Sequence, residues 1–264
     1  MRSDLLSNYD LNNTYFEYNF ISKKIPTIFI HGVGLDNTMW YPQKKYFTDK
    51  STIYYDILNH GKSKSDLNNL SFELFSEQLL NLIQNLKIKK VNLVGFSIGA
   101  LIAQHFTQKN YNKINKLVLI GSVYKRNTKQ ISIVKNRYQN VVNGENITDD
   151  SIKRWFNADY LEKNTNVFDF FYNLLDKKQN KNFLPAYKLF VESDKYNINF
   201  KNFNMPTLVM TGEKEVGSPP RMSIDIQKEI KNSKLYIINN AKHGATIEKA
   251  NDVNKQLLKF LFNE

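Results

Sequence analysis

Short apolar runs alternate with amphipathic stretches along this chain, and this alternation limits the folds that it can adopt. Each run has four to six residues with few polar side chains, as expected for strands that are covered on both faces. Parallel strands need long crossover connections, which are usually helices. The sequence therefore predicts an α/β fold with a mostly parallel sheet and helices on both faces. The predicted strands are Ile25–Ile30, Thr52–Tyr55, Val91–Phe96, Lys116–Ile120, Pro206–Thr211 and Lys234–Ile238.

The stretches between these runs predict the helices. In Ser71–Leu86, apolar side chains recur at steps of three and four and form one face, which begins with Phe72 and Phe75. The Ser71 hydroxyl can cap the first turn of this helix. Further helices are expected at Ile98–Thr107, Pro219–Ile230 and Glu248–Phe262.

The stretch between residues 122 and 204 breaks the alternation. It is rich in Lys, Asn, Tyr and Phe and has no convincing strand. Loops longer than about 15 residues without secondary structure are uncommon in compact domains, so we expect a helical insertion. The predicted division is an α/β core of residues 1–121 and 205–264 with a helical cap (lid) of residues 122–204. Helices within the cap are expected at Ser151–Phe156, Val167–Leu175 and Phe183–Phe190.

The charge and the absence of a targeting segment limit the partners. The formal net charge is +12, but only five of the 37 basic residues are arginine and the lysines are scattered. We therefore expect no nucleic-acid partner. Met1–Phe20 has acidic residues and no apolar signal region, and no apolar stretch in the sequence is long enough to span a bilayer. These features favour a cytoplasmic protein without membrane association.

The chain contains no cysteine, which excludes disulfides, thiolate metal sites and a cysteine nucleophile. A serine nucleophile is instead indicated by the segment GFSIG at residues 95–99, between a predicted strand and a predicted helix. In this G-x-S-x-G elbow the serine lies on a tight turn that exposes its hydroxyl, and the glycines leave room for the chain to reverse. The sequence therefore predicts Ser97 as the nucleophile, with the Ile98 N–H directed at the developing oxyanion.

Three further segments supply the remaining parts of such a site. HGVG at residues 31–34 follows a strand and can offer a second oxyanion donor, the Val33 N–H, with His31 bracing the loop. Glu215 and His243 follow the last two predicted strands, which gives the chain order Ser, acid, His. We interpret Glu213 as a solvated surface residue. The other two histidines, His60 and His105, are expected to be structural.

These motifs resemble the α/β-hydrolase superfamily over nearly the whole chain. The segment DILNHGKS at residues 56–63 is similar to the family's D-x-x-G-x-G-x-S turn, with Asn59 where glycine is usual. Asparagine tolerates left-handed geometry, so this departure is mild. HGVGLDNTMW, IKRWF and GEKEVGSPP look most like 3-oxoadipate enol-lactonases and related small esterases. Most such relatives have aspartate as the triad acid, where this chain has Glu215.

The resemblance implies a serine hydrolase that cleaves a small carboxylic ester or lactone through a Ser-His-Glu triad and an acyl-enzyme. It requires no metal and no organic cofactor, and we expect a monomer or homodimer. Trp40, Phe96 and Trp155 are the expected substrate contacts. An enol-lactonase binds a substrate with a free carboxylate, so Arg137 or Arg154 should then face the pocket.

Three other functions remain open from the sequence. A hydrolase of carbon–carbon bonds in ring-fission products would favour a small polar residue where Val33 stands. A ligand receptor on the same fold would show little or no turnover. A cofactor-free peroxidase is the third alternative.

Overall fold

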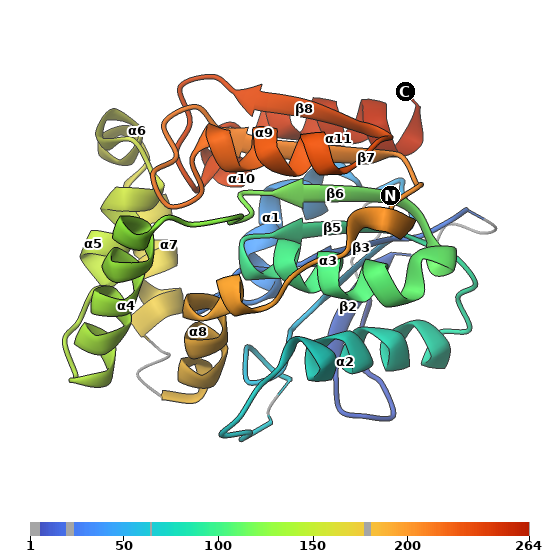
Figure 1. The fold of residues 1–264 in the computed structure, drawn as a ribbon, viewed down its shortest axis with the longest axis horizontal. Helices are drawn as coiled ribbons and strands as arrows, with labels where there is room; N and C mark the ends of the chain where they lie inside the picture. Colours follow the sequence, from blue (N-terminus) through green and yellow to red (C-terminus); the bar gives the residue numbers. More distant parts are fainter. Residues whose placement is uncertain (1–5, 20–23, 64, 177–180, 264) are drawn as a thin grey trace.

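The computed structural model describes residues 6–19, 24–63, 65–176 and 181–263. Within these residues the strands form one eight-stranded sheet in the order β1-β2-β4-β3-β5-β6-β7-β8 (Figure 1). β1 and β2 pair antiparallel, as do β2 and β4, and the remaining pairs are parallel. The strands are β1 (Leu6–Tyr9), β2 (Tyr15–Asn19), β3 (Thr27–Ile30), β4 (Thr52–Tyr55), β5 (Val91–Phe96), β6 (Ile114–Ile120), β7 (Thr207–Gly212) and β8 (Ser233–Ile238).

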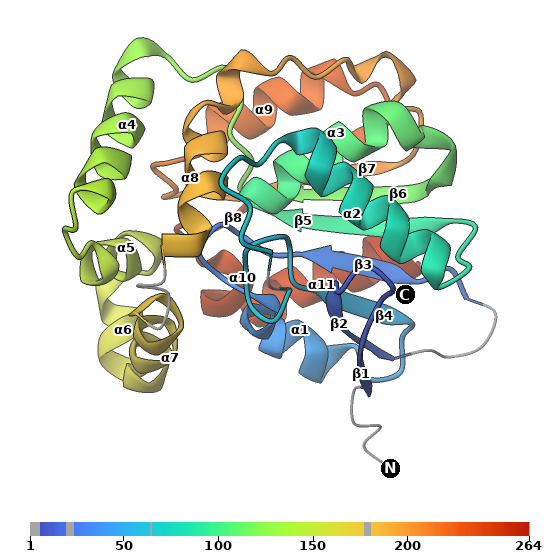
Figure 2. The same cartoon turned by 90° about the horizontal axis from the view of Figure 1, so that it is seen from below.

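Helices cover both faces of this sheet, as the alternation predicts. Figure 2 shows α2, α3 and α9 on one face and α1, α10 and α11 on the other. Within the described residues, no helix is both long enough and apolar enough to cross a membrane. The bounds are α1 (Tyr41–Tyr46), α2 (Phe72–Asn85), α3 (Ile98–Asn110), α9 (Pro220–Glu229), α10 (Ala245–Glu248) and α11 (Ala250–Phe262).

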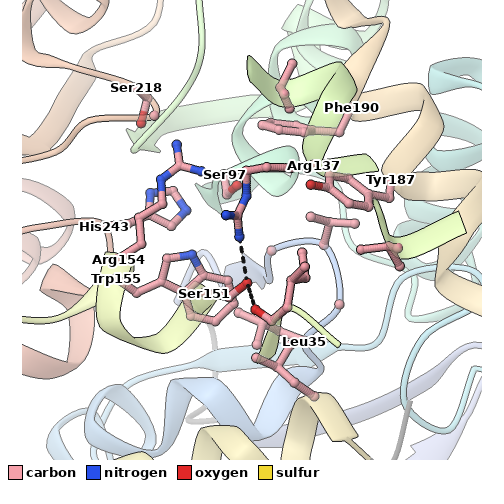
Figure 3. A pocket seen from close by; sticks show the side chains of 18 of the residues that line it. Leu35, Ser97, Arg137, Ser151, Arg154, Trp155, Tyr187, Phe190, Ser218 and His243 are labelled. Atoms are coloured by element: carbon pink, nitrogen blue, oxygen red, sulfur yellow. Dashed lines mark hydrogen bonds between the residues drawn. The ribbon is translucent and has the colours of Figure 1, made fainter. Parts of the chain in front are cut away.

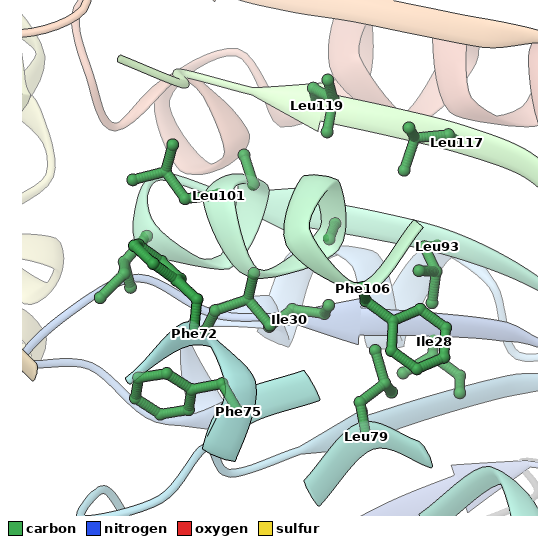
Figure 4. Packing of buried hydrophobic residues seen from close by; sticks show 14 of the residues in the cluster. Ile28, Ile30, Phe72, Phe75, Leu79, Leu93, Leu101, Phe106, Leu117 and Leu119 are labelled. Carbon is green, nitrogen blue, oxygen red and sulfur yellow. The ribbon is translucent and has the colours of Figure 1, made fainter. Parts of the chain in front are cut away.

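Apolar side chains between α2, α3 and the sheet form one of two hydrophobic clusters (Figure 4). Phe72, Phe75 and Leu79 of α2 are fully buried, which accounts for the apolar face in the sequence. The Ser71 hydroxyl caps this helix by accepting a hydrogen bond from the Leu74 N–H at 3.2 Å. Each large side chain buried in this way contributes about 1.5–3 kcal/mol to stability. This packing fixes the turn between β5 and α3, where the predicted nucleophile lies.

All six predicted strands are present, but β1 and β2 were not predicted. Every residue of β1 is exposed, so the strand has no apolar run to identify it. In β2, burial is confined to its first residues, Tyr15 and Phe16. These strands extend the parallel sheet on the β4 side.

The segment between β6 and β7 is helical and lies beyond the carboxyl ends of the strands (Figure 1). Three of its helices match those expected from the sequence, whereas α4 and α6 were not predicted. No residue of α4 is fully buried, but Ile131, Val134 and Tyr138 recur at steps of three and four and form a half-buried face, a period that the sequence-based prediction did not use. The start of α4 also has a signal, because Asn127 and Gln130 form a reciprocal capping box. The helices are α4 (Thr128–Val142), α5 (Thr148–Trp155), α6 (Ala158–Lys163), α7 (Thr165–Asp176) and α8 (Leu184–Val191).

Candidate active site

Ser97 lies on a strained turn between β5 and α3. Its backbone has φ 57° and ψ −119°, a region that residues other than glycine rarely adopt. The flanking glycines leave no space for a side chain. A Cβ on Gly95 would lie 2.3 Å from the Gly99 carbonyl oxygen, and a Cβ on Gly99 would lie 2.3 Å from the Ile30 carbonyl oxygen. The G-x-S-x-G spacing is therefore a steric requirement of this turn.

We expect Gly95→Ala to lower the free energy of unfolding by about 3 kcal/mol or more, because the clash is with backbone that cannot rotate away. Gly144→Ala is the matched control. A Cβ there has nothing within 4 Å, and only its φ of 92° is unfavourable. The control should cost about 1–2 kcal/mol. Urea denaturation measures both variants, and an equal or smaller loss at Gly95 would contradict the steric account.

Glu215 and His243 lie in the loops after β7 and β8 and contact each other directly. Glu215 Oε2 lies 2.5 Å from His243 Nδ1, and Glu215 Oε1 accepts hydrogen bonds from the N–H groups of Gly217 and Ser218 at 2.5 and 3.3 Å. Burial would raise the pKa of Glu215, but the charge of His243 and these hydrogen bonds lower it to about 2. The carboxylate is thus ionised at neutral pH and can orient the imidazole. Glu213 is exposed and accepts a hydrogen bond from the Asn240 N–H at 2.9 Å.

The two backbone N–H groups that the sequence predicts as oxyanion donors have no acceptor in the described part of the chain. They belong to Val33, in the loop after β3, and to Ile98, the first residue of α3. N–H groups in the first turn of a helix have no partner within the helix, which leaves the Ile98 donor available. The Ile98 side chain itself is buried in the core. Both donors can stabilise negative charge on an oxygen bound beside Ser97.

Two histidines hold the loop that contains Val33. His60 Nε2 accepts a hydrogen bond from the Gly34 N–H at 3.0 Å, and His31 Nε2 accepts one from the Ile57 N–H at 3.1 Å. His105 stacks on Phe72 with ring centroids 4.0 Å apart, and burial lowers its pKa to about 4. All three therefore have structural contacts, as expected for them from the sequence.

Ser97, His243 and Glu215 line one cavity of about 360 Å³ (Figure 3). The described structure contains no hydrogen bond between Ser97 and His243. Such contacts in enzymes are often long until substrate binds. No group of three or more His, Asp or Glu side chains in the described ranges could hold a metal ion.

Of the three predicted substrate contacts, two line the cavity. Phe96 and Trp155 do so, and their ring centroids lie 4.7 and 6.1 Å from that of His243. Trp40 does not line it, so that expectation is not met. The Trp40 side chain is fully buried and packs edge-on against Phe29 and Phe96, behind the pocket wall.

The helical segment contributes basic and aromatic side chains to the same cavity. Arg137 of α4 and Arg154 of α5 both line it, and so does Arg126, which is paired with Asp194 at 2.6 Å. Tyr187 of α8 also lines it, and sequence reasoning did not identify this residue. Its position in a helix with apolar residues on most sides gives no signal that separates it from packing aromatics.

Comparison with known proteins identifies a family of the same fold and several relatives within it. Residues 26–250 match the model of the alpha/beta hydrolase fold family. The chain is 25% identical to (E)-2-((N-methylformamido)methylene)succinate hydrolase of Acinetobacter baylyi, over 95% of both chains. It is 21% identical to 3-oxoadipate enol-lactonase 2 of the same organism, over 71% of this chain and 70% of that one.

The solved structures show the same fold. The enol-lactonase of Burkholderia xenovorans aligns with a TM-score of 0.81 and 18% identity, covering 97% of this chain and 100% of that one. The family match spans most of the chain. The mostly parallel sheet and the strained turn at Ser97 are both features expected of this fold. This chain therefore belongs to the α/β-hydrolase family.

Proposed function

We propose that the protein hydrolyses a small carboxylic ester or lactone through an acyl-enzyme on Ser97. The observation that carries this proposal is the strained Ser97 turn in the same cavity as the hydrogen-bonded His243–Glu215 pair. The relatives include proteins named as an enol-lactonase and as a hydrolase of a substituted succinate, which supports a small-molecule substrate.

The proposed reaction has two steps. Ser97 Oγ attacks the carbonyl carbon while His243 Nε2 takes its proton, and Glu215 stabilises the imidazolium. The N–H groups of Val33 and Ile98 stabilise the tetrahedral oxyanion, each by about 3–4 kcal/mol if they resemble a measured oxyanion donor. His243 then gives its proton to the leaving oxygen. Water, deprotonated by His243, releases the acid and restores Ser97.

A panel of esters and lactones of graded chain length tests this function. We expect turnover of short esters or lactones in the first arm of the panel. Ring-fission products that contain a scissile carbon–carbon bond form the second arm of the panel. Turnover of that arm alone would contradict the proposal and favour a carbon–carbon bond hydrolase. Binding without turnover in both arms would favour a receptor.

We further propose that the helices between β6 and β7 act as a cap that sets substrate size. The end of α5 contacts the loop that carries His243, because the Gly244 N–H donates to the Trp155 carbonyl oxygen at 2.7 Å. The Lys242 ammonium donates to the Phe156 carbonyl oxygen at 2.9 Å in the same region. The cap is thereby connected to the catalytic base.

Replacing Trp155 by alanine should enlarge the acyl pocket and shift the preference toward longer esters. We expect the ratio of kcat/KM for long over short acyl chains to rise roughly tenfold. The backbone contact to Gly244 is kept in this variant, so the melting temperature should change less than the preference. Phe168→Ala is the control, because Phe168 packs in α7 but does not line the cavity. An unchanged preference with a large loss of stability would make Trp155 a packing residue.

A further inference from the structure

The loops that carry the acid and the base of the triad are joined through their backbones. The Glu215 N–H donates to the Gly212 carbonyl oxygen at 3.2 Å, which closes a turn at the end of β7. The Lys214 N–H donates to the Ala241 carbonyl oxygen at 2.8 Å, two residues before His243. The separation of the two backbones is thereby fixed, so the length of the acid side chain decides whether acid and base meet.

A glutamate side chain has the length that this separation requires. Glu215 Oε2 lies 2.5 Å from His243 Nδ1, and Oε1 accepts hydrogen bonds from the N–H groups of Gly217 and Ser218. The Glu215 side chain is only 2% exposed, so it has no room to search for other positions. An aspartate carboxylate would lie roughly 1.5 Å nearer the backbone, the length of one carbon–carbon bond. At that position it would lose its hydrogen bond to His243.

Gly217 leaves open the space that this longer side chain uses. A Cβ on Gly217 would lie 3.2 Å from Glu215 Oε1 and 2.7 Å from Arg154 Nη2. Gly217 does not have a positive φ, so its backbone does not require a glycine. What the position requires is space, which the carboxylate and the guanidinium share. Figure 3 shows Arg154 on the same side of the cavity as His243 and Ser218.

The two neighbours of Gly217 differ in their freedom to move. The Arg154 guanidinium is the far end of a long, half-buried side chain and can rotate away from an added methyl group. Burial and the charge of Arg137 lower the pKa of Arg154, and the charge of Glu215 offsets part of this lowering. The Glu215 carboxylate is held at both oxygens, so it cannot rotate away. A methyl group at position 217 would instead displace it by a few tenths of an ångström, together with its contact to His243.

We infer that Gly217 is a positioning residue of the triad, because its missing side chain makes room for a glutamate as the acid. Glu215 and Gly217 are then a matched pair. The inference rests on the proposed hydrolysis at Ser97 and concerns the acid that orients its base. It has two consequences. Aspartate cannot replace Glu215 without loss, and a side chain at position 217 is harmful only while the acid is glutamate.

A double-mutant cycle with 4-nitrophenyl acetate tests this pairing. Glu215→Asp should lower kcat about 10²-fold, the cost of a misplacement of about 1 Å. Gly217→Ala should lower kcat about tenfold in the wild-type protein, because the displacement is smaller. In the Glu215→Asp background the same change should cost less than about twofold, since no carboxylate then lies beside the methyl group. Wild-type activity of Glu215→Asp, or equal losses from Gly217→Ala in both backgrounds, would overturn the inference.

Two control variants separate this effect from other causes. Glu213→Asp removes one methylene group from an exposed acid in the same turn and should change kcat by less than about twofold. Arg154→Met removes the guanidinium that lies nearest to the added methyl group. The tenfold loss from Gly217→Ala should persist in the Arg154→Met background. If it disappears there, the methyl group acts through the arginine, and the inference is wrong.

The His243 Nδ1 proton gives a measurement that does not depend on turnover. A proton shared between an imidazole and a carboxylate resonates far downfield of amide protons, and its loss in His243→Gln identifies the signal. We expect the signal to move upfield or vanish in Glu215→Asp and Gly217→Ala, and to stay unchanged in Glu213→Asp. This pattern without ester turnover would contradict the proposed function and support the inference. Ester turnover with an unchanged signal in Gly217→Ala and Glu215→Asp would overturn the inference alone.

Discussion

Replacing Ser97 by alanine is expected to lower ester turnover by about five to six orders of magnitude, as removal of the nucleophile does in other serine hydrolases. Ser97 is the residue on the strained turn, and its hydroxyl cannot be replaced by a neighbour, because the next residue, Ile98, directs its side chain into the core. Initial rates with a 4-nitrophenyl ester measure the loss. A fluorophosphonate should label the wild-type protein on Ser97 and leave the variant unlabelled.

Ser223→Ala is the matched control for this prediction. The Ser223 hydroxyl is buried in α9 and does not line the cavity. Its removal should change neither labelling nor turnover by more than about twofold, since an isolated substitution away from the site has a small effect. If Ser97→Ala kept wild-type activity, or if another serine carried the label, the nucleophile would lie elsewhere.

Replacing Glu215 by glutamine should lower turnover by about 10⁴-fold while the fold is retained, as observed when the orienting acid of a triad becomes an amide. The glutamine keeps the size of the side chain but loses the charge that stabilises the His243 imidazolium. It also presents an amide that can hold the wrong tautomer of the imidazole. The structure has Glu215 Oε2 at 2.5 Å from His243 Nδ1, so this contact is direct.

Glu213→Gln provides the comparison within the same turn. Glu213 is exposed and accepts a hydrogen bond from the Asn240 N–H rather than contacting His243. The turnover of the Glu213→Gln variant should therefore stay within about twofold of wild type. Circular dichroism and melting temperature check that Glu215→Gln is folded. A larger loss at Glu213 than at Glu215 would contradict the assigned acid. Equal, small losses would mean that His243 acts without a carboxylate.

Much of the fold could be predicted because the central strands are apolar on both faces. Runs such as Val91–Phe96 are fully buried in the structure, and burial on both faces is what produces a continuous apolar run. β1 was missed for the opposite reason, since it is exposed and pairs only at the sheet edge. The period in α4 is weaker, because Ile131, Val134 and Tyr138 form a face that is only half-buried.

The positions of the site residues followed from where strands end. Carboxyl ends of parallel strands meet at one edge of the sheet, so residues after β5, β7 and β8 could be expected together. Asn59 has φ 61°, the left-handed geometry that the turn motif requires. The cavity wall was harder to predict, because it depends on how helices far apart in sequence pack. Trp40 shows this, because its side chain packs against Phe96 in the core and does not line the cavity.

The most direct test of the proposed function is detection of the acyl-enzyme. Rapid acid quench of the protein with a 4-nitrophenyl ester, followed by intact mass and peptide analysis, should show one added acyl group on the peptide that contains Ser97. The adduct should form within the burst of nitrophenol, decay with the steady-state rate, and be absent in Ser97→Ala. Steady turnover with no covalent adduct, or with the acyl group on another residue, would contradict acyl transfer through Ser97.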